Sequence, residues 1–177
     1  MNSTTSTPNP IIFDLIALTK PRVNFLIIFT AIVGMLLAQD FNLNYSLMIY
    51  ASIGIYLAAS AAAVINQIVD QKIDAIMDRT KSRPLIKGNV TSKHAIYFSI
   101  VISLISTYIL YEYVNTITTV LTLFSIIVYS IIYSVYLKNL TSQNIVIGGI
   151  AGAMPPLLGW TAITCILYTS PSPRDAQ

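Results

Sequence analysis

Five long stretches of this chain carry no charged residue, and they constrain its fold more than any other feature. They cover residues 23–39, 41–69, 95–111, 113–137 and 145–168. Each is close to the roughly 20 residues that an α-helix needs to cross a bilayer. A soluble helical protein would show polar faces at helical spacing along such stretches, and these do not. The pattern predicts an all-α fold, a polytopic bundle of transmembrane helices with four complete spans and the start of a fifth.

Composition and charge agree with this fold class. Hydrophobic residues make up 55% of the chain and charged residues 10%, with a mean hydropathy of +0.70, whereas soluble domains are about 25% charged. The cations gather before the first stretch, between the second and third, and between the fourth and fifth: Lys20, Arg22, Lys72, Arg79, Lys81, Arg83, Lys87, Lys93 and Lys138. By the positive-inside rule the N-terminus and the 71–93 loop are cytoplasmic. Topology therefore explains the net charge of +3, and we expect no nucleic-acid partner.

Two of the stretches contain small residues that allow close helix packing. Residues 58–63, Ala-Ala-Ser-Ala-Ala-Ala, predict that the second helix lies inside the bundle. Residues 148–153 predict a second close-packing face, and Pro155 and Pro156 directly after it predict a helix break.

The two ends of the chain differ from the membrane domain, which we expect to extend over residues 11–164. Residues 1–10 are polar, are expected to be disordered and do not form a secretory signal. From Cys165 the apolar sequence gives way to a tail rich in Ser and Pro. We expect this tail, residues 165–177, to be non-native and the natural chain to continue. The lone Cys165 allows neither a disulfide within the chain nor a cluster of metal-binding thiols.

Three polar residues at the end of the second stretch are the main candidates for chemistry. Asn66, Asp70 and Asp74 are four residues apart, which in a helix places them on one face over a rise of about 12 Å. Polar residues reaching for headgroup water would be the simpler interpretation. Mg²⁺, however, binds one or two carboxylates and completes its shell with waters and substrate phosphates. We therefore predict that these three residues, called the polar stripe below, are the metal-binding and catalytic residues.

Basic residues follow the polar stripe and predict an anion site beside the metal. The planar guanidinium group suits pairs of phosphate oxygens, so Arg79 and Arg83 are better candidates than Lys81. Lys20 and Arg22 can either reach the same cytoplasmic end or anchor the first helix in the membrane. Metal and anion sites together suggest that the ligand is a diphosphate.

These residues resemble a known family. The pattern Asn-x3-Asp-x3-Asp, followed by Asp-Arg-Thr-x2-Arg-Pro-Leu-x2-Gly over residues 78–88, is similar to the first aspartate-rich motif of the UbiA superfamily of intramembrane prenyltransferases. Residues 18–22, 133–138 and 147–160 are similar to the protoheme IX farnesyltransferase (heme O synthase) branch of that superfamily. The last of these segments favours this branch most, and the resemblance covers residues 11–164.

The resemblance implies a bundle of nine helices, of which about five are present, with two aspartate-rich motifs facing a central cavity. Gln67 stands where many superfamily members have Asp. The second aspartate-rich motif and roughly the last four helices are absent from these residues. We therefore expect the chain to be C-terminally truncated and inactive by itself.

The resemblance also implies a reaction and a location. The farnesyl group of farnesyl diphosphate is transferred to a vinyl group of heme B to give heme O, in the inner membrane of a bacterium. Mg²⁺ bridges Asp70 and Asp74 to the diphosphate. The expected substrate-binding residues are Lys20, Arg22, Arg79, Lys81, Arg83, Tyr133 and Lys138. Tyr133 can line the cavity and stabilise a carbocation, although tyrosines at positions 129, 133 and 136 are also typical of an interfacial belt.

Three alternatives remain open at this point. The acceptor can be a quinone precursor or another aromatic compound instead of heme. A transporter or channel can use Asp70 and Asp74 as an ion site, although repeated halves with broken helices would then be expected. Finally, the chain can be an inert fragment.

Overall fold

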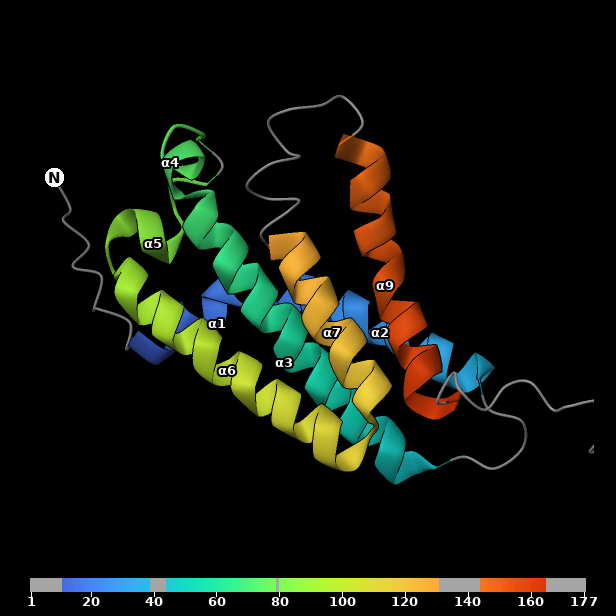
Figure 1. Ribbon diagram of the computed structural model, residues 1–177. Coiled ribbons are helices and arrows are strands. Elements are labelled where there is room, and N and C mark those ends of the chain that lie inside the picture. Colours follow the sequence, from blue (N-terminus) through green and yellow to red (C-terminus); the bar gives the residue numbers. More distant parts are fainter. Residues whose placement is uncertain (1–10, 39–43, 79, 131–143, 165–177) are drawn as a thin grey trace, which may run out of the picture.

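The computed structural model describes residues 11–38, 44–78, 80–130 and 144–164. Every regular element in these residues is a helix, which confirms the predicted all-α class (Figure 1). The helices are α1 (Ile11–Leu18), α2 (Pro21–Leu37), α3 (Tyr45–Val69), α4 (Gln71–Asp74), α5 (Pro84–Lys87), α6 (Ser92–Tyr113), α7 (Thr116–Ile127) and α9 (Asn144–Thr164). The segments expected to be disordered or non-native, 1–10 and 165–177, lie outside the described residues.

Local sequence signals set where the helices begin. Side chains of Asn44, Thr91 and Asn115 accept hydrogen bonds from backbone N–H groups in the first turns of α3, α6 and α7. These contacts satisfy donors that have no partner inside the helix. Pro21 begins α2, a position where its missing N–H costs nothing.

The helices α2, α3, α6, α7 and α9 each overlap one of the five uncharged stretches, and α2, α6 and α9 begin one to three residues before theirs. Among the described residues, α3 and α6 are long and apolar enough to cross a membrane. The pair α1 and α2, bent by 47° at their junction, makes a third span if it crosses as one unit. The end of the fourth stretch, residues 131–137, lies outside the described residues, and α7 is a shorter apolar helix.

The predicted helix break at Pro155 and Pro156 is wrong, because α9 continues through both prolines to Thr164. Neighbouring helices and local backbone adjustments permit proline within membrane helices. In this chain α9 packs closely along α2, which supports it at this point.

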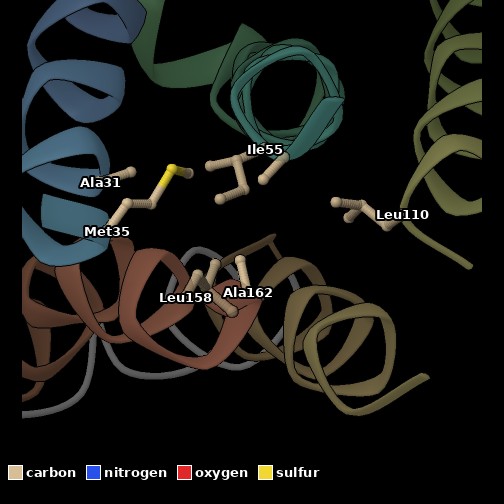
Figure 2. Packing of buried hydrophobic residues seen from close by; sticks show 7 residues of the cluster. Ala31, Met35, Ile55, Leu110, Leu158 and Ala162 are labelled. Atoms are coloured by element: carbon tan, nitrogen blue, oxygen red, sulfur yellow. The ribbon is translucent and has the colours of Figure 1, made fainter. Parts of the chain in front are cut away.

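Helix α3 lies at the centre of the bundle, with α6 on one side and α2, α7 and α9 on the other (Figure 1). The alanines at 58, 61, 62 and 63 are buried, as the small-residue prediction required. The main core joins α2, α3, α6 and α9 through Ala31, Met35, Ala51, Ile55, Leu110, Leu158 and Ala162 (Figure 2).

Two glycines bring α2 and α9 into backbone contact. A Cβ atom on Gly34 would overlap the carbonyl oxygen of Pro156, and one on Gly159 would overlap that of Ala31. The contact is therefore possible only without side chains at these positions, in keeping with the small-residue interfaces of membrane helices.

The 71–93 segment folds over the end of α3 and contains α4 and α5 (Figure 1). A second core, made of Leu18, Val64, Leu85, Val90 and Ala95, connects it to α1, α3 and α6. The segment that carries the basic residues is thus packed against the bundle.

Candidate diphosphate and metal site

The polar stripe crosses the boundary between α3 and α4. Helix α3 ends at Val69, yet Asp70 keeps a helical backbone (φ −77°, ψ −2°). The Asp70 N–H donates to the Asn66 carbonyl at 2.9 Å, and the Asp74 N–H donates to the Asp70 carbonyl at 2.8 Å. The four-residue spacing therefore places the three residues on one helical face across the boundary. Asn66, Asp70 and Asp74 are 9%, 6% and 5% exposed, so all three are buried at the end of the central helix.

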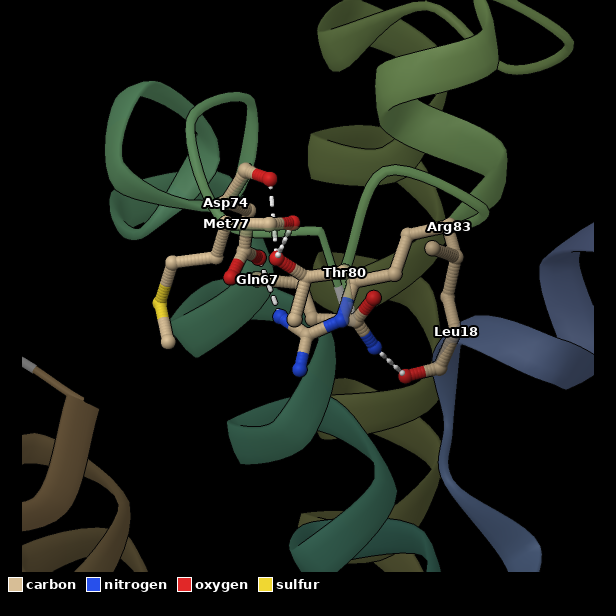
Figure 3. A network of polar contacts seen from close by, with 6 residues as sticks. All are labelled: Leu18, Gln67, Asp74, Met77, Thr80 and Arg83. Carbon is tan, nitrogen blue, oxygen red and sulfur yellow. Dashed lines mark hydrogen bonds and ion pairs between the residues drawn. The ribbon is translucent and has the colours of Figure 1, made fainter.

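The loop after α4 folds back onto Asp74. Arg83 Nη1 forms an ion pair with Asp74 Oδ2. The Thr80 hydroxyl donates to the Asp74 carbonyl at 2.8 Å and lies 3.1 Å from the Met77 carbonyl (Figure 3). Sequence reasoning placed Arg83 beside the stripe, and the structure brings its guanidinium group to one of the stripe's two carboxylates.

The other predicted substrate-binding residues have different surroundings. Lys81 is exposed and pairs with Asp78 at 2.6 Å, away from the buried stripe. Arg22 is exposed on α2, whereas Lys20 is half-buried and lines a cavity. Arg79, Tyr133 and Lys138 lie outside the described residues.

The cavity has a volume of about 590 Å³ and lies between α2, α3, α7 and α9. Its α3 wall is apolar and includes Ala59, Ala62 and Ala63. Asn66 follows Ala62 by four residues, so the polar stripe continues the same face of α3 one turn further on. The three stripe residues do not themselves line the cavity, and they extend this face of α3 beyond the apolar wall and into α4.

Polar groups also line the cavity from α2 and α7. Asn24 and Thr122 are buried, and Tyr129 is half-buried. Tyr129 is the tyrosine that the described residues place at the cavity, and the role expected of Tyr133 stays a prediction because Tyr133 lies outside them.

Sequence reasoning missed two buried amides, Asn24 and Gln67. Gln67 Nε2 donates to the Leu18 carbonyl at 2.6 Å. Asn24 Nδ2 donates to the Thr19 carbonyl and to Ser60 Oγ, both at 2.8 Å. A usable signal existed, because amides inside apolar membrane stretches normally face the protein interior and bond there.

The donor set of the stripe fits a hard divalent cation. It offers two carboxylates and one amide oxygen. A larger cluster, with three or more Asp, Glu, His or Cys side chains placed to hold a metal, does not occur in the described residues. Such a set leaves several coordination positions for water and phosphate, as Mg²⁺ prefers.

Comparison with known proteins gives an independent line of evidence. A model of the UbiA prenyltransferase family matches residues 27–173. The chain is 50% identical over 151 residues to a protoheme IX farnesyltransferase of Hahella chejuensis and 55% identical over 150 residues to one of Xanthomonas campestris. A third, from Vesicomyosocius okutanii, is 51% identical over 157 residues. These matches cover 85%, 83% and 88% of this chain, and 50%, 50% and 53% of the relatives.

The chain thus spans about half the length of the curated relatives that it matches. No solved structure matches it significantly.

Proposed function

The chain belongs to the UbiA prenyltransferase family, whose members are integral membrane proteins, and we propose that its protein transfers the farnesyl group of farnesyl diphosphate to a vinyl group of heme B. The name protoheme IX farnesyltransferase, carried by relatives about half identical to this chain, supports this choice of substrates. The observation that carries the proposal is the buried polar stripe, which follows the α3 wall of a largely apolar cavity along the chain. A diphosphate with an apolar tail is complementary to such an arrangement.

Asp70 and Asp74, with Asn66 beside them, are the residues that would hold Mg²⁺ at the diphosphate. When bound, the metal supplies positive charge that stabilises the diphosphate as a leaving group. The chain's own cations act on the same group. Arg83, already beside Asp74, offers paired N–H donors for phosphate oxygens.

The cavity serves the apolar part of the substrate. Its alanine wall accommodates a prenyl chain, and its largely apolar lining disfavours water beside the reactive allylic carbon. The C1–O bond of farnesyl diphosphate breaks, and diphosphate leaves with the bonding electrons. C1 then bonds to one vinyl carbon of heme B, water adds its oxygen to the other, and a proton is released.

The decisive experiment uses the complete gene product in membranes, with heme B, farnesyl diphosphate and Mg²⁺. We expect Asp70→Asn to reduce heme O formation about 100-fold or more. The variant loses a carboxylate that would hold Mg²⁺, and with it the positive charge that stabilises the leaving diphosphate. Asp78→Asn is the matched control, since Asp78 follows Asp74 by four residues in sequence but is an exposed carboxylate that pairs with Lys81.

Activity retained by Asp70→Asn would contradict the assigned site. Farnesyl transfer to a quinone precursor but not to heme B would contradict the assigned acceptor and leave the prenyltransferase assignment in place.

A further inference from the structure

The junction between α1 and α2 has an unusual backbone. Lys20 lies in the left-handed region, with φ 52° and ψ 62°. It is the one residue other than glycine with positive φ among those that the structure describes. Residues other than glycine rarely adopt this backbone conformation, and it persists where the surrounding structure imposes it.

Two buried amides impose it here by binding the two carbonyl groups that precede Lys20. Gln67, on α3, donates to the Leu18 carbonyl at 2.6 Å, and Asn24, on α2, donates to the Thr19 carbonyl at 2.8 Å. Both side chains are almost fully buried, with exposed fractions of 3% for Gln67 and 1% for Asn24. The second hydrogen bond of Asn24, to Ser60, attaches the junction to α3 again.

These hydrogen bonds fix the backbone position of a cationic residue, Lys20. Lys20 is among the residues that line the cavity, and the α3 wall of that cavity precedes the polar stripe along the chain. Gln67 follows Asn66 directly in sequence, and Figure 3 shows its side chain directed at Leu18 from the same cluster that contains Asp74, Thr80 and Arg83. One residue of α3 therefore connects the acidic site to the backbone that carries Lys20.

We propose that Gln67 and Asn24 are positioning residues, which hold Lys20 at the cavity so that its ammonium group binds the diphosphate of the prenyl substrate. This proposal rests on the proposed function, because it takes the ligand from it. Gln67 acts as a hydrogen-bond donor here. A carboxylate at the same position could not donate to the Leu18 carbonyl.

The test is a double-mutant cycle on the purified complete gene product. Binding of inorganic pyrophosphate in the presence of Mg²⁺ is measured by calorimetry, and KM and kcat for farnesyl diphosphate are measured in parallel. Gln67→Met has similar length and no donor. We expect it to weaken pyrophosphate binding and raise KM about 10-fold, the scale on which residues that orient a ligand group act, with little change in kcat.

Combining Gln67→Met with a substitution of Lys20 distinguishes a positioning role of Gln67 from a general effect on stability. Lys20→Met should weaken binding by a similar factor, and the double variant should bind no more weakly than Lys20→Met alone, because Gln67 acts only through Lys20. Ser106→Ala is the matched control. It removes another buried bond to α3, the 2.7 Å contact of Ser106 Oγ with the Gly54 carbonyl, and should leave pyrophosphate binding unchanged.

Independent, multiplying effects of Gln67→Met and Lys20→Met would overturn the proposal, as would unchanged binding by Gln67→Met. If Gln67→Met does not fold, Asn24→Leu gives the same test from the other carbonyl, because it removes the donor to Thr19 without adding a charge. Absence of pyrophosphate binding by the unaltered protein would overturn the proposed function itself, and with it this inference.

Discussion

Among single residues, the buried hydroxyls of α7 divide into paired and unpaired groups. Thr118 Oγ1 donates to Thr161 Oγ1 at 3.1 Å, whereas Thr122 Oγ1 is buried without a hydrogen-bond partner in the described part of the chain. Thr122 also lines the cavity. A buried hydroxyl that lacks a partner is unfavourable, while a paired one contributes about 1 kcal/mol.

We therefore expect opposite outcomes for two isosteric substitutions. Thr118→Val should lower the Tm of the protein in detergent, because it breaks a buried hydrogen bond. Thr122→Val should leave the Tm unchanged or raise it. An equal loss of Tm in both variants would mean that the Thr122 hydroxyl has a partner, such as a water molecule in the cavity.

The ion pair between Arg83 and Asp74 differs from that between Lys81 and Asp78 in burial. The Asp74 side chain is 7% exposed and that of Asp78 is 96% exposed. Arg83→Met leaves a buried carboxylate without its cation and should lower stability by about 1–3 kcal/mol, since Arg83 itself is partly exposed. Lys81→Met, the control at an exposed pair, should change the Tm little.

Thermal unfolding without and with Mg²⁺ checks this prediction. If the stripe binds Mg²⁺, the metal should restore part of the Tm that Arg83→Met loses, because it replaces the missing positive charge. A Tm for Arg83→Met equal to that of the unaltered protein would contradict the importance of the pair.

Among the helices, the crossing of α2 and α9 depends on the absence of two side chains. Gly34→Ala should destabilise the protein by about 1–3 kcal/mol, because the new methyl group overlaps the Pro156 carbonyl oxygen and separates the helices. Gly149→Ala, on α9, has nothing within 4 Å of the new Cβ and serves as the control. Thermal unfolding of both variants in detergent checks the prediction, and equal Tm values would contradict it.

Hydropathy and short motifs were enough to predict the approximate position of each long helix that the structure describes. They also predicted the burial of the α3 alanines and the proximity of Arg83 to the stripe. These features depend on local sequence, namely on uncharged stretches, on helix periodicity and on the separation of only nine residues between Asp74 and Arg83.

The features that were missed depend on contacts between distant segments. Nothing near Pro155 indicates that α2 supports the helix there. Likewise, nothing near Gln67 indicates that its partner is the Leu18 carbonyl, 49 residues earlier. Sequence periodicity shows that such an amide is buried in a helix but does not identify the group that it binds.

Across the molecule, polar side chains that join the helices are buried, while many large apolar side chains are exposed. Buried bonds such as those of Asn24, Ser106 and Thr118 join the helices, while large apolar side chains, including Phe25, Phe29, Ile100 and Leu104, are about half to two-thirds exposed. Water would not favour this surface, whereas lipid does. The bundle is thus arranged for a bilayer, and the remaining question at this scale is which end faces the cytoplasm.

The distribution of cations predicts that the end with the 71–93 segment faces the cytoplasm, because cations gather in that segment and the turn after α6 carries none. In a Cys165→Ser background, single cysteines replace exposed residues at the two ends, as Ser82→Cys and Glu112→Cys. A membrane-impermeant maleimide added to intact bacterial spheroplasts should label the cysteine at 112 and label the one at 82 only after the cells are lysed. Labelling in the reverse order would put the polar stripe on the outer face, away from cytoplasmic prenyl diphosphates, and would contradict both the orientation and the proposed function.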